Sequence, residues 1–305
     1  MNRQVAAIVV NWNGGDENLE CLRSLGREGI EEEWIYFIDN DSSDGSREAV
    51  EAEFPNAVHI RNHENMGYGD ANNQGIDLAL QRGADVCLLV NNDAELIEGC
   101  LQGLLTALVA DSNLAIVGPR VLYKTRPDLI WAAGGMLTFR QNLSTLIGHR
   151  KQDHEGLRKT IAVDYVIGAV MLVRKEVFEK IGLLDGSFFA YHEDLDFCIR
   201  ASYEGFGVAC VGGVSAFHHA GHSTGGGYSA RRKYMIGVNS IWFLRRHGTP
   251  TRWLRFILYD VLTLPIVWSI GLFRGRSMAV LSKAAGIRDG LRGIRVTAAS
   301  VSDRS

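Results

Sequence analysis

Val5-Ala-Ala-Ile-Val-Val10, Trp34-Ile-Tyr-Phe-Ile38 and Val86-Cys-Leu-Leu-Val90 are short apolar runs that each end on a polar residue. Their length and their β-branched residues predict buried strands. Leucines at helical spacing lie between the first two runs, and a second helical pattern covers Gly69 to Gln81. Strands and helices that alternate in this way predict an α/β fold with a doubly wound, mostly parallel sheet.

Polar residues follow the predicted strands at the edge where ligands bind in open parallel sheets. The strand ends carry, in chain order, Asn11, Asp39-Asn-Asp41, Asn65-Met-Gly67 and Asn91-Asn-Asp93. Turn chemistry alone explains any one of them. Four such ends around one crevice indicate a ligand site, in which the Asp39 carboxylate is suited to accept hydrogen bonds from a nucleobase or a ribose.

A corner rich in glycine and amide side chains follows a further short predicted strand, Ala57 to Ile60, and leads into the helical pattern after it. It consists of Asn65, Gly67, Gly69, Asn72 and Asn73. Glycine allows the backbone to approach a ligand closely, and a helix N-terminus favours phosphate. The corner is not a G-x-G-x-x-G motif and the chain has no P-loop, which disfavours a dinucleotide-dependent dehydrogenase and a kinase.

The Asn91-Asn-Asp93 tripeptide is a candidate metal site because a fully apolar run fixes it at the edge of the core. Mg²⁺ is usually held by one or two carboxylates together with substrate phosphates. Asp93 is the candidate ligand, and Asn91 and Asn92 offer neutral oxygens or hydrogen bonds. The alternative is that Asp93 caps a helix beginning near Glu95, and the tripeptide alone favours that reading.

Two further clusters carry titratable groups. His192-Glu-Asp-Leu-Asp196 places three carboxylates within four residues, which predicts a raised pKa or a charged partner for at least one of them. If Asp194 opens a helix, its position suits a general base, although acidic residues are also favoured there as caps. In His218-His-Ala-Gly-His222, the histidines could bind a metal or a phosphate, and their spacing does not say which one matters.

The composition is that of an ordinary globular protein. The chain has 305 residues, of which 46% are hydrophobic and 22% charged, and this balance excludes a disordered or collagen-like chain. Its five cysteines are scattered without a C-x-x-C spacing. The sequence therefore predicts neither a zinc site nor a disulfide framework.

The C-terminal part is basic and partly apolar. Residues 245–305 carry eleven Lys or Arg against three Asp, whereas the net charge of the whole chain is −3. The mostly apolar run from Phe256 to Phe273 is near the lower limit for a membrane span and contains Asp260 and Pro265. We expect a helix pair that lies on an anionic membrane surface, and no nucleic-acid partner, because long apolar runs separate the basic residues.

The alternative for this part is an ordinary helical subdomain packed on the α/β part. In either case the sequence predicts two regions, a ligand-binding α/β domain over 1–228 and a helical basic region over 229–305. Nothing in the sequence indicates the oligomeric state.

The motifs taken together resemble glycosyltransferase family 2, and in particular its rhamnosyltransferase-like branch. The resemblance runs from about Val5 to Ser223, with the motifs in the family's order. The stretches that carry it are Val9-Val-Asn-Trp-Asn13, Asp39-Asn-Asp-Ser-Ser-Asp-Gly-Ser46, Asn65-Met-Gly-Tyr-Gly69 with Asn72-Asn73, Asn91-Asn-Asp93, Gly168-Ala-Val-Met171 and His192-Glu-Asp-Leu-Asp196. Gly286-Ile-Arg-Asp-Gly-Leu-Arg-Gly293 also looks like the ending of membrane-associated members.

The resemblance implies a GT-A fold and an inverting transfer of a sugar, with rhamnose a candidate, from a nucleotide-diphosphate donor. The acceptor would be a saccharide or a lipid-linked saccharide used in cell-surface polysaccharide synthesis at the cytoplasmic face of the membrane. By the same resemblance, the donor-contacting residues would be Asn11, Asp39, Asn65, Gly67, Asn72, Asn73 and Asn92, with Asn11 and Asp39 at the nucleoside.

The resemblance also assigns the chemistry. Asp194 matches the catalytic base of the family's Glu-Asp motif, and Glu193 of the same motif is the second candidate catalytic residue. Asp93 matches the last residue of a D-x-D-type motif that binds Mg²⁺ or Mn²⁺, and His218 matches a histidine near the metal or diphosphate. Asn91 replaces the first acid of that motif, which leaves fewer charges for the metal.

Three alternatives to a glycosyltransferase remain at this point. A sugar nucleotidyltransferase usually opens with a Gly-rich, Arg-bearing loop, and Asn11-Trp-Asn-Gly-Gly-Asp16 lacks the arginine. A glycoside hydrolase would use two carboxylates such as Glu193 and Asp196 but would not explain the nucleotide-type crevice. A non-catalytic membrane-associated protein that binds a nucleotide sugar would have no need of Asp93 and Asp194.

Overall fold

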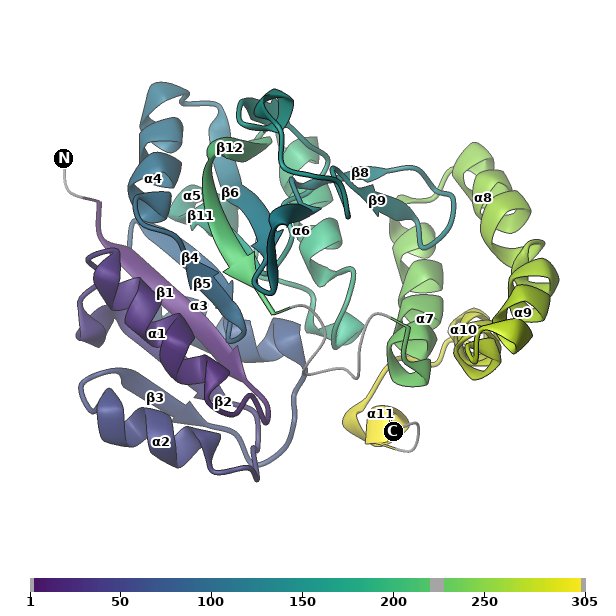
Figure 1. Cartoon of the computed structure of the whole chain (residues 1–305), viewed down its shortest axis with the longest axis horizontal. Coiled ribbons are helices and arrows are strands. Elements are labelled where there is room, and N and C mark those ends of the chain that lie inside the picture. Colours follow the sequence, from purple (N-terminus) through teal and green to yellow (C-terminus); the bar gives the residue numbers. More distant parts are fainter. Residues whose placement is uncertain (1–2, 220–227, 303–305) are drawn as a thin grey trace.

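The computed structural model describes residues 3–219 and 228–302 of the chain. Its centre is a mixed sheet in the order β10-β12-β6-β11-β4-β1-β2-β3, with β5 beside β12 and β7 beside β6 (Figure 1). The strands are β1 (Val5–Asn11), β2 (Ile35–Asp39), β3 (Val58–Arg61), β4 (Val86–Asn91), β5 (Ala94–Leu96), β6 (Leu114–Tyr123), β7 (Arg126–Ala132), β10 (Thr160–Ala162), β11 (Val170–Arg174) and β12 (Gly207–His218). A separate hairpin consists of β8 (Gly135–Leu137) and β9 (Ser144–Leu146).

The predicted parallel, doubly wound arrangement is confirmed in the first half of the chain. Strands β3, β2, β1 and β4 pair in parallel. Strand β11 then joins β4 and β6 as an antiparallel strand, so its N-terminal end lies beside the carboxyl end of β4. This reversal brings the Gly168 loop to the same edge as the polar strand ends.

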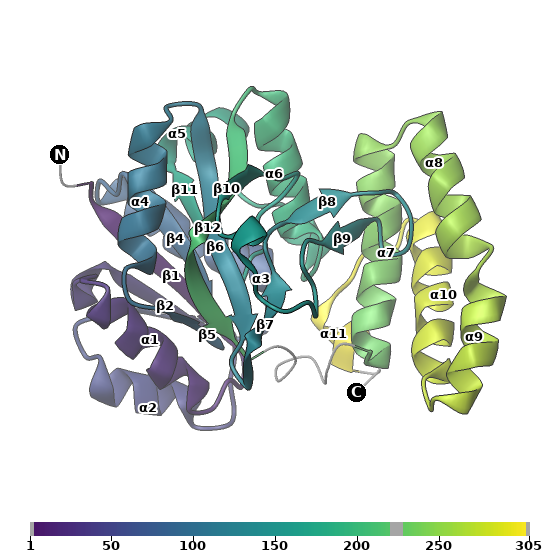
Figure 2. The same ribbon diagram turned by 45° about the horizontal axis from the view of Figure 1, so that its top comes forward.

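Helices cover both faces of the sheet (Figure 2). Helices α1 (Glu17–Arg27), α2 (Ser46–Glu53) and α4 (Cys100–Ala110) contribute to the core on one face. Helices α3 (Tyr68–Gln81), α5 (Lys175–Ile181) and α6 (Glu193–Tyr203) contribute to the core on the other. Neighbouring residues of a strand point to opposite faces, and Ile8 and Val9 of β1 accordingly belong to different cores.

One local prediction differs from the structure. No helix begins near Glu95, which lies in β5, so the reading of Asp93 as its cap is wrong. The region 141–159 contains β9 and a short 3₁₀ helix. All five cysteines are buried and free, in agreement with the absence of a predicted disulfide framework.

The C-terminal region is helical and packs against the α/β part through α7 (Ala230–His247). Further helices are α8 (Pro250–Phe256), α9 (Leu264–Phe273), α10 (Ser277–Leu291) and α11 (Ala298–Ser302), and a π-helical turn, Ile257–Val261, joins α8 to α9. Helix α10 returns beside both α9 and α7 (Figures 1 and 2). Glycines permit its close approach to α7, since a Cβ on Gly286 would lie 2.2 Å from the Tyr234 carbonyl oxygen.

Helices α8 and α9 form one long apolar stretch, Pro250–Phe273, that is long and apolar enough to cross a membrane. Only 17% of its most apolar window is buried in the protein. Large exposed apolar side chains lie along it, namely Leu254, Ile257, Leu258, Leu262, Ile266, Trp268, Ile270, Leu272 and Phe273.

Candidate active site

A cavity of about 730 Å³ opens at the carboxyl ends of the parallel strands, where the sequence predicted a crevice. It brings together many of the predicted site residues, namely Asn65, Gly67, Asn91, Asn92, Asp93, Glu193, Asp194 and His218. The lining does not include four further predicted site residues, Asn11, Asp39, Asn72 and Asn73. A second hollow of about 300 Å³ adjoins it at Asn92 and Asp93 and is otherwise lined by residues 13–17 and Asp44.

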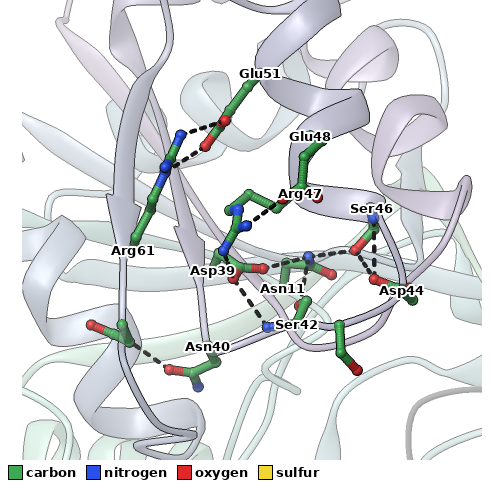
Figure 3. Close-up of polar contacts among 12 residues, drawn as sticks. Asn11, Asp39, Asn40, Ser42, Asp44, Ser46, Arg47, Glu48, Glu51 and Arg61 are labelled. Atoms are coloured by element: carbon green, nitrogen blue, oxygen red, sulfur yellow. Dashed lines mark hydrogen bonds and ion pairs between the residues drawn. The ribbon is translucent and has the colours of Figure 1, made fainter.

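Asn11 and Asp39 are fully buried and bonded to each other beneath the cavity (Figure 3). The Asn11 amide donates to Asp39 Oδ1 at 2.9 Å and to Ser46 Oγ at 2.9 Å. Its Oδ1 accepts from the Asn92 amide at 3.1 Å. In this state the two residues hold the ends of β1, β2 and β4 together, and a direct contact with a nucleoside stays a prediction.

The first part of the glycine- and amide-rich corner, Asn65 and Gly67, lines the cavity. Asn40 donates from its amide to the Gly67 carbonyl at 3.1 Å and faces Asn65 at 3.3 Å. Asn72 donates to the Tyr68 carbonyl, and Asn73 exchanges hydrogen bonds with the backbone of Leu184. These two amides therefore brace α3 and its neighbouring loop.

Asp93 and His218 face each other at the cavity wall. Asp93 Oδ1 lies 3.0 Å from His218 Nε2, and both side chains are buried. Among the described residues, neither atom has a hydrogen-bond partner. The Trp131 ring packs on the imidazole with centroids 4.6 Å apart. Gly221 and His222, which the sequence analysis associated with this motif, lie outside the described residues, and His219 faces Glu17 instead.

The spacing of Asp93 and His218 fits two neighbouring ligands in the coordination shell of one divalent cation. Two ligands at right angles in an octahedral shell lie about 3.0 Å apart when each bond is about 2.1 Å. Within residues 3–219 and 228–302, no group of three or more His, Cys, Asp or Glu could hold a metal. Substrate phosphates and water would therefore have to supply the remaining ligands.

Asp194 lies in the first turn of α6 with its carboxylate fixed by two backbone N–H groups. Gly168 donates to Oδ2 at 2.9 Å and Leu195 to Oδ1 at 2.7 Å. Burial raises the pKa of Asp194, and these two hydrogen bonds act in the opposite direction. Ala169, the residue after Gly168, accepts a hydrogen bond from the Asn91 N–H at 2.9 Å. A short backbone path therefore joins Asp194 to the end of β4.

Glu193 is buried beside Asp194, and its Oε2 has no hydrogen-bond partner among the described residues. Burial and the neighbouring Asp194 charge raise its pKa well above the usual range. Asp196, the third acid of the cluster, does not line the cavity. It binds Arg200 at 2.8 Å, Arg246 at 2.9 Å and His247 at 2.8 Å, and thereby ties α6 to the end of α7.

The backbone before α6 is strained. Phe189, Tyr191 and His192 have φ of +64°, +70° and +76°, and such conformations cost on the order of 1–3 kcal/mol each. The Asn239 amide nitrogen of α7 holds the loop by facing the carbonyls of Phe188, Ala190 and Tyr191 at 2.8–2.9 Å. Sequence reasoning missed this contact because Asn239 is almost fifty residues away.

Part of the cavity wall is basic, which the sequence motifs did not indicate. Arg231, Arg232 and Lys233 at the start of α7 line it, together with Arg276. Arg232 lies over the Tyr191 ring at 5.1 Å, and Arg276 over the Tyr228 ring at 5.0 Å. The run Arg231-Arg-Lys233 was the available signal, but nothing in the sequence places it near Asp194.

The sequence model of the family described as "Glycosyl transferase family 2" matches residues 6–182. A low-salt glycan biosynthesis hexosyltransferase of Haloferax volcanii is 27% identical over 216 residues, covering 70% of this chain and 67% of that protein. An N-acetylglucosaminyl-diphospho-decaprenol L-rhamnosyltransferase of Mycobacterium tuberculosis is 25% identical over 278 residues, covering 83% of this chain and 89% of that protein.

Solved structures agree on the fold. A mannosyltransferase from Pyrobaculum calidifontis, in complex with GDP-Man and Mn²⁺, superposes with a TM-score of 0.55 at 15% identity. The match covers 99% of this chain and 79% of that one. The predicted GT-A fold is thereby confirmed, and the family match disfavours the nucleotidyltransferase and the non-catalytic binding protein.

Proposed function

The chain belongs to glycosyl transferase family 2, and from this premise we propose that it transfers a sugar, with inversion, from a nucleotide-diphosphate donor to a hydroxyl group. The observation that carries the proposal is that Asp93 and Asp194 line one cavity of about 730 Å³. Its volume lies within the range of small-molecule sites. The mycobacterial relative supports rhamnose as the sugar and a lipid-linked saccharide as the acceptor, in the assembly of a surface glycan.

Asp194 is the residue we assign as the general base. Inversion needs a single displacement at the anomeric carbon, so the acceptor hydroxyl must lose its proton on the face opposite the leaving nucleotide. The carboxylate is held by the Gly168 and Leu195 N–H groups. It is partly buried, and a raised pKa makes it a better proton acceptor than a solvated aspartate.

Asp93 and His218 are the residues we assign to a Mg²⁺ or Mn²⁺ ion, and Glu193, Asn65, Gly67 and Asn92 complete the walls around the donor. The Mn²⁺ in the mannosyltransferase complex supports this choice of ion. When bound, such an ion neutralises charge on the departing diphosphate. Below the cavity, Asn11 and Asp39 keep the strand ends in register, and Asn72 and Asn73 keep α3 in place.

We also propose the two-part organisation, a donor-binding domain over 1–228 and a membrane-facing helical region over 229–305. The protein would attach to the cytoplasmic face of a membrane through the exposed apolar side chains of α8 and α9. Arginines at the ends of that stretch, such as Arg255 and Arg274, would meet anionic head groups.

The decisive experiment measures nucleotide release from UDP-, dTDP- and GDP-sugars, with and without a lipid-linked saccharide acceptor and Mn²⁺. We expect release from one class of donor that depends on the acceptor. Acceptor-independent release would indicate a hydrolase, and pyrophosphate formation from a nucleoside triphosphate and a sugar phosphate would indicate a nucleotidyltransferase. Either result contradicts the proposal.

A further inference from the structure

Lys233 is a buried cation in the wall of the catalytic cavity. Only 9% of the residue is exposed, and it lines the same cavity as Asp194. Its polar contacts are weak, a 3.4 Å approach to Asn142 Oδ1 and the Tyr228 ring at 4.6 Å. In the part of the chain that the structure describes, no carboxylate pairs with it.

The surroundings of Lys233 carry surplus positive charge. Asp260 is the nearby acid, and it is already paired with Lys283 of α10. Asn142 lies between the two lysines and accepts from Lys283 at 3.0 Å. Burial, followed by the charges of Lys283 and Arg232, lowers the pKa of Lys233 to about 8. Because a buried charge without a partner is costly, this arrangement indicates that an anion from a ligand completes it.

The position of Lys233 indicates which ligand supplies the anion. Asp260 belongs to the π-helical turn between α8 and α9, so the lysine cluster adjoins the exposed apolar stretch Pro250–Phe273. On its other side, Lys233 faces the cavity that holds Asp194. A group bound there lies between the reacting hydroxyl and an apolar surface, which is the place of a phosphate in an amphiphile made of a sugar, a phosphate and an apolar chain.

We propose that Lys233, together with Arg232 and Arg276, binds a phosphate group of an amphiphilic acceptor. This inference rests on the proposed transferase function and adds the chemistry of its acceptor. The donor diphosphate is assigned to other residues of the cavity wall, Asp93 and His218. Arg232 and Arg276 are already oriented by the rings of Tyr191 and Tyr228, so little side-chain entropy is lost when they meet an anion.

The test is a binding measurement on the full chain by titration calorimetry, with farnesyl diphosphate as the amphiphilic probe and dTDP and UDP as donor-like probes. Lys233→Met should weaken farnesyl diphosphate binding by about 10- to 100-fold, the loss typical of a charge-assisted hydrogen bond. Binding of the nucleotides and of farnesol should change by less than about 2-fold, and Lys233→Arg should restore most of the affinity.

The matched control is Lys180→Met, the same change on the exposed surface of α5, which should leave all affinities unchanged. If Lys233→Met does not fold, Arg232→Gln is measured in its place with the same expectation. Because no turnover is required, the outcome is independent of whether sugar transfer is detected.

Three results would overturn the proposal. One is an unchanged affinity for farnesyl diphosphate in Lys233→Met. Another is an equal loss for dTDP or UDP, which would assign the lysine to the donor diphosphate. The third is inorganic pyrophosphate binding as tightly as farnesyl diphosphate, which would make the site one for free phosphate and not for an amphiphile.

Discussion

Asp194 is held in place by two hydrogen bonds, one of which an amide side chain can reproduce. Its Oδ2 accepts from Gly168 N and its Oδ1 from Leu195 N. In Asp194→Asn the amide oxygen can keep one of these bonds, but the side chain cannot take a proton. We expect kcat to fall by about 100- to 10,000-fold, the usual contribution of a general base, while the dissociation constant of the donor stays nearly unchanged.

Donor affinity is measured on the same variant by calorimetry, with Asp77→Asn on the exposed face of α3 as the control. A variant that no longer binds the donor would show that Asp194 has a structural role and would remove the base from the mechanism.

Glu193 predicts a pH dependence of stability. Its pKa in the folded protein is raised well above the usual value, chiefly by burial. The folded protein therefore holds this proton to a higher pH than the unfolded chain, whose Glu pKa is about 4.3. Between these two pKa values the unfolding free energy decreases as pH rises, by about 1.4 kcal/mol for each pH unit.

Glu193→Gln removes this titration, so the variant should gain stability relative to the wild type between pH 5 and pH 8. Urea unfolding at both pH values measures the difference. A wild type whose stability is lost in parallel with that of the variant would show that Glu193 is charged or solvated in the folded state.

At the scale of single elements, the loop before α6 depends on α7. The Asn239 amide nitrogen faces three loop carbonyls, and the Phe189 carbonyl accepts from Tyr68 N at 2.5 Å. A Cβ on Gly67 would lie 2.6 Å from the same carbonyl. The loop is thus held between the glycine- and amide-rich corner and α7. Because α6 follows this loop, the loop sets the position of Asp194 in the first turn of α6.

Asn239→Leu keeps the volume but leaves the carbonyls unpaired. We expect kcat to fall by at least about 10-fold while donor KM changes little, because Asn239 positions Asp194 without touching substrate. Ser240→Ala is the control, since the buried Ser240 Oγ has no hydrogen-bond partner among the described residues. The assay is run where circular dichroism shows both variants folded. A loss in KM alone, or equal losses in both variants, contradicts the positioning role.

The elements also show what the sequence could reveal. That Asp93, Asp194 and His218 line one cavity agrees with the sequence motifs, because each lies in a short motif at a strand or helix end; their roles stay predictions. Periodicity placed β1, β2, β4 and the helix after Gly69 correctly, since burial on two faces imposes it. Lys233 and Asn239 were not predictable, because their function arises from α7 packing against loops far away in sequence. The β5 strand at Glu95 was missed for the same reason: it exists by pairing with β12.

For the molecule as a whole, the exposed side chains of α8 and α9 predict membrane binding. Leu262 and Ile266 are 61% and 63% exposed. Replacing both with Asp should abolish co-flotation with liposomes that contain anionic lipid, because each change removes apolar contact and adds a like charge. Replacing Arg255 and Arg274 with Gln should weaken binding only at low salt.

Flotation of the full-length wild-type chain at low salt is the reference. If it remains unbound, or if the double Asp variant floats equally well, then α8 and α9 have some other partner. Glu179→Gln on the exposed surface of α5 is a control that should not alter flotation.

The glycine contacts between α7 and α10 matter for anyone who wishes to shorten this protein. Deleting everything after α7 would remove the exposed apolar stretch Pro250–Phe273. It would also remove α10, which packs against Gly237 and Tyr234 of α7. Helix α7 supplies part of the cavity wall, and α7 in turn packs against α10. A truncated protein is therefore expected to lose the part of the cavity that α7 forms, together with its exposed apolar surface.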